Sequence, residues 1–221
     1  MKKRFLVCLM AIIMAVSALS VPTFAVEAKT EEDELEQTLK TVFSFLNSQE
    51  THLQPSERVD YEIPVGENTV LVTVENQLVK QARTPTYGQD TFGGIRINNS
   101  YVYKLTIKNF YSGSGVIMYT IDYHVWRTDD PNTVPFRLTP DKVAIDVTPP
   151  SGCTLVSSYA SVNPEYLMTS MIETYGDVEF KTAFLGIKKA LSLQIQLWSH
   201  KYQDPSRDDG YISINYQYEV K

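Results

Sequence analysis

Residues 93–127 have the sequence GGIRINNSYVYKLTIKNFYSGSGVIMYTIDYHVWR, in which apolar and polar side chains alternate along two long arms. Alternation with a period of two is typical of a β-strand that buries one face. Between the arms lies Tyr111–Gly115, whose glycines supply the positive φ angles that a tight turn needs. The stretch therefore predicts a long antiparallel β-hairpin with one apolar face.

The register of this hairpin follows from its two apolar faces. They must point to the same side of the sheet, because a slip of one residue reverses every side chain. Pairing centred on Gly113, with an odd number of loop residues, meets this condition. Each cross-strand pair contributes roughly 0.2–1 kcal/mol. The predicted pairs are Phe110 with Val116, Ile107 with Tyr119, Leu105 with Ile121, Tyr103 with Tyr123, Lys104 with Asp122 and Thr106 with Thr120.

Other extended segments continue this pattern on both sides of the hairpin. They are residues 59–65, 69–80, 142–148, 153–162, 178–185, 191–198 and 212–220. The segments 191–198 and 212–220 alternate strictly, and we expect them to form a second hairpin. Many strands joined by short turns predict an all-β fold. The architecture that we expect is an antiparallel two-layer β-sandwich, immunoglobulin-like or jelly-roll-like.

The segment Thr30–Gln49 carries helical signals instead. Thr30 is a suitable N-cap, and the acidic residues that follow it suit the positive end of a helix dipole. Apolar residues then recur at helical spacing: Leu35, Leu39, Val42, Phe43 and Leu46. We expect an N-terminal amphipathic helix that packs against the sheet, and a removable pro-segment is the alternative.

A second helical signal begins at Asn163, an N-cap residue followed by Pro164 at the first helical position. Apolar residues at helical spacing follow it: Leu167, Met168, Met171, Ile172 and Tyr175. Gly176 is placed to end the helix. The sequence thus predicts a short helix over residues 163–176.

The N-terminus has the organisation of a secretory signal peptide. Three basic residues, Lys2, Lys3 and Arg4, precede an apolar run that ends at Val21, and the expected cleavage site follows Ala25, or alternatively Ala28. This leader resembles those of Gram-positive bacterial exports. We expect a signal peptide over 1–25, an N-terminal helix and linker over 26–57, and a β-sandwich domain over 58–221. The product should be secreted and have no membrane span after cleavage.

Charge and cysteine content narrow the classes of partner. The net charge is −6, and removal of the three basic residues of the leader makes it −9. An acidic protein is a poor candidate for binding nucleic acid, which requires concentrated positive charge. Cys153 is the only cysteine beyond the leader. We therefore expect no intrachain disulfide, and a fold that is held together by burial alone.

Motifs for catalysis and for metal binding are weak. The three histidines lack the spacing of a metal site, and the Gly113-Ser114-Gly115 segment closes a hairpin instead of forming a nucleophile elbow. A turn near the C-terminus is a weak calcium candidate, although Arg207 stands among its carboxylates. Those carboxylates are Asp204, Asp208 and Asp209. We expect no cofactor, and a non-enzymatic protein.

Four ring side chains on the polar side of the strands form a candidate ligand-binding set: His124, Trp126, Trp198 and Tyr211. Flat rings beside amide and hydroxyl groups stack on sugars or contact a protein partner, and packing against other elements is the alternative. We expect a secreted bacterial binding protein whose partner is a protein or glycan of the cell envelope or host. The alternatives are a carbohydrate- or peptidoglycan-acting hydrolase, with carboxylates about 5–10 Å apart, and an acidic immunity or inhibitor protein.

Overall fold

The structure is a computed structural model that describes residues 34–49, 57–80, 91–92, 95–96, 99–127, 136–166, 170–183, 186–201 and 210–220. The chain divides into two units, residues 1–37 and 38–221. Every described strand belongs to the second unit. The first unit is described only over residues 34–37, which are helical. The expected signal peptide lies outside the described residues.

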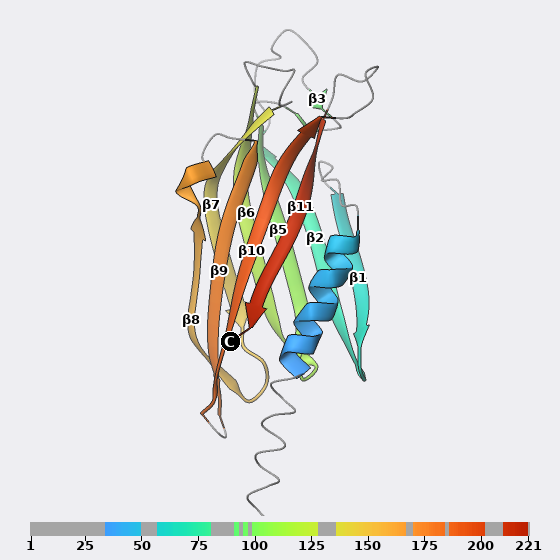
Figure 1. The fold of residues 1–221 in the computed structure, drawn as a ribbon, viewed down its shortest axis with the longest axis vertical. Helices are drawn as coiled ribbons and strands as arrows, with labels where there is room; N and C mark the ends of the chain where they lie inside the picture. The colour runs from blue at the N-terminus through green and yellow to red at the C-terminus, as the bar shows by residue number, and fades with distance from the viewer. Residues whose placement is uncertain are drawn as a thin grey trace, which may run out of the picture. The chain divides into compact units, whose positions relative to one another are not determined.

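The strands form two large antiparallel sheets and one small one (Figure 1). The five-stranded sheet has the order β1-β2-β5-β6-β7, the four-stranded sheet has the order β11-β10-β9-β8, and β3 pairs with β4. The strand bounds are β1 Glu57–Val65, β2 Asn68–Lys80, β3 Thr91–Phe92, β4 Ile95–Arg96, β5 Asn99–Tyr111, β6 Ser114–Arg127, β7 Phe136–Thr148, β8 Cys153–Val162, β9 Met171–Thr182, β10 Lys188–Lys201 and β11 Gly210–Val220.

Side chains from the inner faces of the two sheets meet in a common core. The hydroxyl of Tyr103 on β5 lies 2.8 Å from that of Tyr216 on β11, and the ring of Phe110 on β5 lies 6.2 Å from that of Phe180 on β9. The predicted antiparallel two-layer β-sandwich is confirmed. Its described strands form a meander, in which consecutive strands pair within each sheet and β7 passes to the second sheet at β8. This order differs from the Greek-key order that immunoglobulin and jelly-roll folds share.

The core is rich in tyrosine. Tyr101, Tyr103, Tyr119 and Tyr123 are fully buried, and all four lie on the apolar parity of the central hairpin. The Tyr123 hydroxyl donates to Asn76 Oδ1 at 3.1 Å, so this phenol has a partner within the core. Burial raises the pKa of Tyr103, Tyr123 and Tyr216. These phenols therefore stay protonated at any physiological pH.

The register of the β5–β6 hairpin differs from the predicted one by two residues. Leu105 pairs with Tyr119, and Ile107 pairs with Ile117, where Ile121 and Tyr119 were expected. Lys104 lies opposite Thr120, so the predicted pair of Lys104 with Asp122 is absent from the ladder. A shift of two residues leaves each side chain on its expected face. The predicted faces are therefore right and the predicted pairs are wrong.

The cause of this shift is a tight turn combined with a β-bulge. Tyr111 pairs with Ser114 around a two-residue loop, Ser112 and Gly113, whose φ angles of 44° and 65° suit a type I′ turn. That loop alone would turn the two apolar faces to opposite sides. Asn109, with φ 61°, and the residue after it both oppose Gly115, and this extra residue restores the parity.

Residues 171–182 form strand β9, so the helix predicted over residues 163–176 is wrong. A 3₁₀ turn, η1, occupies Pro164–Tyr166, and Asn163 Oδ1 accepts from the Glu165 backbone N–H at 3.1 Å, which explains the helix-start signal. At Gly176 a Cβ would lie 2.3 Å from the Tyr119 ring of the opposite sheet. The glycine thus permits close approach of the two layers, where a helix end was expected.

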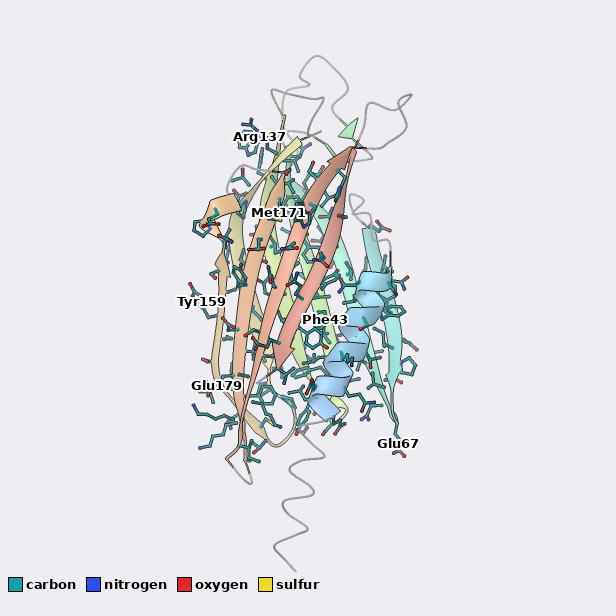
Figure 2. The ribbon with its side chains drawn as sticks, viewed as in Figure 1. Phe43, Glu67, Arg137, Tyr159, Met171 and Glu179 are labelled. Carbon is teal, nitrogen blue, oxygen red and sulfur yellow. The ribbon has the colours of Figure 1, made fainter. Side chains whose placement is uncertain are left out.

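The N-terminal helix spans residues 34–48, and its predicted start at Thr30 lies outside the described residues. In its part from residue 38 on, Phe43 stacks on the Tyr218 ring of β11 with centroids 5.1 Å apart (Figure 2). Asn47 bonds both backbone groups of Tyr216, donating to its oxygen at 2.8 Å and accepting from its nitrogen at 3.0 Å. One side chain therefore occupies backbone groups at the edge of β11. No described helix is long and apolar enough to cross a membrane.

Candidate ligand-binding face

The outer face of the four-stranded sheet gathers polar and aromatic side chains into rows that run across the strands. Alternation places the outward residues of each strand on this face, and the register aligns them. One row contains Tyr159, Asp177, Ser192 and Glu219, the next Ser161, Tyr175, Gln194 and Gln217, and a third Glu173, Gln196 and Asn215. Each row crosses neighbouring strands, so its members lie close in space although far apart in sequence.

A hollow of about 510 Å³ lies over the first two of these rows. Its walls carry hydroxyl, amide and carboxylate groups together with the ring of Tyr175. Asp177 Oδ1 accepts from the Ser192 hydroxyl at 2.6 Å within it. The lining residues are Ser161, Tyr175, Asp177, Ser192, Leu193, Gln194, Gln217, Tyr218 and Glu219. Concave surfaces with convergent polar groups are where proteins bind small ligands.

Glu173 is the centre of the hydrogen-bond network beside this hollow. Its Oε1 accepts from Asn163 Nδ2 at 2.7 Å and from the Tyr175 hydroxyl. Its Oε2 accepts from Gln194 Nε2 at 2.7 Å and from Gln196 Nε2 at 2.6 Å. All four donors are uncharged, and only 6% of Glu173 is exposed. The carboxylate fixes the orientation of three amides and one phenol ring beside the hollow.

The protonation state of Glu173 follows from this arrangement. Burial by itself raises the pKa of the carboxyl, but the hydrogen bonds from Tyr175, Asn163, Gln196 and Gln194 outweigh it, so the pKa lies below its ordinary value of 4.5. Glu173 is therefore ionised at neutral pH. An ionised acceptor with four occupied lone-pair directions is suited to positioning its neighbours and unsuited to donating a proton.

The network extends from Gln196 toward the far end of the sheet. Because Gln196 Nε2 donates to Glu173, its Oε1 is the acceptor, and it receives Asn215 Nδ2 at 3.0 Å and the Trp198 indole N–H at 3.3 Å. Further along the same face, His200 Nε2 lies 2.6 Å from the Ser213 hydroxyl. The indole of Trp198 is thus connected through Gln196 to the carboxylate beside the hollow.

The structure separates the four residues of the sequence-predicted set onto two faces. Trp198 lies on this face. The backbone of Tyr211 pairs with that of His200 at the end of the β10–β11 ladder. The side chain of Tyr211 lies outside the part of the molecule that the structure describes. His124 and Trp126 lie on the outer face of the five-stranded sheet, in the opposite layer. Their ring centroids are 4.1 Å apart, so these two do form a local pair. The four do not form one site.

Sequence reasoning missed Glu173, Tyr175 and Asn163 as site residues, because it assigned their segment to a helix. The alternative pattern was present. Glu173, Tyr175 and Asp177 alternate with Ile172, Thr174, Gly176 and Val178, which are the inward residues of β9. The same segment also has apolar residues at helical spacing. Because Asn163 and Pro164 are a typical helix start, the sequence predicts a helix and not a strand.

Metal binding has no support in the described ranges, where no group of three or more histidine, cysteine, aspartate or glutamate side chains could hold an ion. The calcium candidate of Asp204, Asp208 and Asp209 lies outside those ranges. Comparison with known proteins gave no match to a protein-family model, to a curated protein or to a solved structure.

Proposed function

We propose that this protein is an exported binding protein that holds a neutral, hydroxyl-rich ligand, a glycan of the cell envelope or host, on the outer face of β8–β11. The observation that carries the proposal is the Glu173 network, which holds Tyr175 and Gln194 in fixed orientations beside the 510 Å³ hollow. Groups fixed before binding lose little conformational entropy when a ligand arrives.

The chemistry of the hollow favours sugars over charged ligands. Sugar hydroxyls both donate and accept hydrogen bonds, as do the amides of Gln194 and Gln217, while the exposed ring of Tyr175 offers an apolar face for stacking. Asp177 and Glu219 disfavour anionic ligands by like-charge repulsion. A neutral glycan both exchanges hydrogen bonds with the amides and avoids this repulsion, and the signal peptide predicted over residues 1–25 supports an extracellular ligand.

Hydrolysis of such a glycan is the second candidate, because two carboxylates share the hollow. Asp177 and Glu219 lie on either side of Ser192, which pairs with both of them. Two strand spacings place their backbones about 10 Å apart. An inverting glycosidase holds its two carboxyl groups at roughly 6.5–9.5 Å. The backbone separation of Asp177 and Glu219 is thus close to the carboxyl separation of an inverting glycosidase, which leaves room for a water molecule beside the sugar.

The test is binding to arrays of envelope polysaccharide fragments and host glycans, with matched variants at two glutamates. Glu173→Gln cannot accept four donors, and we expect affinity to fall about ten-fold, equivalent to about 1.4 kcal/mol. The control is Glu75→Gln on the other outer face, where Glu75 accepts from Gln77; we expect its affinity to be unchanged.

Mass analysis of the recovered glycan separates the two candidates. An intact glycan supports binding, whereas cleavage that Asp177→Asn or Glu219→Gln abolishes supports hydrolysis. The proposal fails if no glycan binds, or if Glu173→Gln and Glu75→Gln bind equally well.

A further inference from the structure

Strand β8 is an edge strand with unusual composition and exposure. It pairs only with β9 among the described strands, and its ten residues include no charged residue and no proline. Residues 154–159 are exposed on both faces of the strand, and Tyr159 is 65% exposed (Figure 2). An edge of this kind is a template for pairing with another strand.

The other three edges of the two large sheets, β1, β7 and β11, each carry protection against such pairing. β1 contains four charged residues and Pro64, and β7 contains Pro140 together with charged residues. At β11, Asn47 occupies both backbone groups of Tyr216. Charges, prolines and covering elements are the means by which proteins block edge pairing. β8 has only a bulge at Val156, which leaves a regular run after it.

The last seven residues of β8 have nearly the same sequence in both directions. Residues 156–162 have the sequence VSSYASV, centred on Tyr159, and only Ser158 and Ala160 differ on reversal. A twofold interface requires self-complementary surfaces, because a residue i that meets residue j of the other copy is matched by residue j meeting residue i. An antiparallel pair of such segments places valine opposite valine and serine opposite serine.

We propose that two copies of this protein pair through β8, antiparallel, with Tyr159 on the twofold axis. Tyr159 of each copy then faces Tyr159 of the other, Ser157 faces Ser161, and Val156 faces Val162. The two four-stranded sheets join into one sheet of eight strands. A twofold axis perpendicular to the sheet keeps both outer faces on the same side, so the two hollows lie together and bind a repeating ligand bivalently.

Electrostatics permits this pairing despite the net negative charge of the chain. The acidic residues that pair with the central part of β8 are Asp177, opposite Tyr159, and Glu179, opposite Ser157, and both lie one strand away on β9. Asp177 lies about 14 Å from its counterpart across three strand spacings, beyond the screening length of about 8 Å at physiological salt. Glu179 forms an ion pair of 2.6 Å with Lys188. Repulsion across the axis is therefore weak.

Sedimentation of the purified exported protein tests the proposal. We expect a dimer, which Tyr159→Lys converts to a monomer, because two ammonium groups then meet on the axis. The control is Val79→Lys, since Val79 is 62% exposed on β2 and lies outside the interface; this variant should stay dimeric. A wild-type monomer at every concentration overturns the proposal, as does a dimer that Tyr159→Lys leaves intact.

A cross-linking experiment tests the register itself. Tyr159→Cys, in a Cys153→Ser background, places two thiols directly opposite each other, within reach of a disulfide. Mild oxidation should yield a covalent dimer. Leu155→Cys, the control, faces Asn163 in this register and should not cross-link. Cross-linking of the control and not of Tyr159→Cys would contradict the proposed axis. Neither experiment uses a glycan, so its outcome is independent of the proposed function.

Discussion

The two outer faces of the sandwich are built by the same alternation but differ in how their polar groups are connected. On the five-stranded sheet the bonds join side chains in separate small groups: Arg58 pairs with Asp60 at 3.1 Å, Thr73 donates to the same carboxylate at 2.6 Å, and Ser100 lies 3.0 Å from His124 Nδ1. On the four-stranded sheet, four neutral donors from three segments converge on the buried Glu173. Alternation alone places polar side chains on a face. A buried acceptor such as Glu173 also fixes the orientation of the side chains that donate to it.

The largest difference is expected when the acceptor itself is changed. Glu173→Gln keeps the shape but presents an amide to four donors, and hydrogen bonds to a charged group contribute about 1.5–3 kcal/mol each. We expect the free energy of unfolding to fall by about 2–4 kcal/mol. Glu75→Gln on the opposite face should change it by no more than about 0.5 kcal/mol. Urea unfolding measures the free energy of unfolding of both variants. Equal losses would contradict the claim that the Glu173 network stabilises its face more than the bonds of the opposite face do.

A smaller difference is expected at the amide that links Glu173 to the far end of the sheet. Gln196→Ala removes a donor to Glu173 and an acceptor for Trp198 and Asn215. We expect a loss of about 1–2 kcal/mol in the free energy of unfolding. Gln77→Ala removes an exposed bond to Glu75 and should cost a few tenths of a kcal/mol. A larger effect at Gln77 would contradict the comparison.

How much of this could be predicted from the sequence differs between the fold and the site. Period-two patterns predicted the faces of β5, β6, β10 and β11, because burial of one face constrains every second residue. The exact register could not be predicted, because the bulge at Asn109 shifts it through a backbone conformation that the pattern does not encode. Tertiary packing of Gly176 against Tyr119 likewise overrode a local helix signal.

The site was harder to predict than the fold, because its members come from different strands. Trp198 beside Gln194 and Gln196 was recognisable on one strand. The convergence of Gln194 and Gln196 on Glu173 depends on the β9–β10 register, which no local pattern encodes. His124 and Trp126 resembled the same kind of surface in sequence, yet they lie on the opposite layer.

Substitutions of aromatic residues test whether the two outer faces differ in their contribution to glycan affinity. Tyr175 lines the hollow, and Tyr175→Ala should weaken glycan affinity about five-fold, equivalent to about 1 kcal/mol. Trp198→Ala, further along the network, should weaken it about two-fold. Trp126→Ala should leave it unchanged, because Trp126, which is 40% exposed, lies on the other face. Titration calorimetry ranks the three, and a dominant effect at Trp126 would reverse the assignment of the faces.

The smallest expected effect is a change with pH in the difference in unfolding free energy between the wild type and Glu173→Gln. The pKa of Glu173 is lowered in the folded state, so its contribution is complete above the ordinary value of 4.5 and is lost as pH falls below it. The stability difference between wild type and Glu173→Gln should therefore narrow below about pH 4.5. Hydrogen bonds from Arg58 and Thr73 also lower the pKa of Asp60, but this group is exposed and its effect should vanish in salt. A difference that stays constant between pH 6 and pH 3 would contradict the role given to Glu173.

The chain has two tryptophans, and each reports on one outer face. Their indole N–H signals in a nitrogen-15 correlation spectrum, assigned with Trp126→Phe, therefore test the central claim most directly. On addition of a glycan that the arrays identify, the signal of Trp198 should shift, because its N–H donates to Gln196 of the Glu173 network. The signal of Trp126 should stay in place. A shift of Trp126 alone, or of neither signal under saturating ligand, would contradict the account.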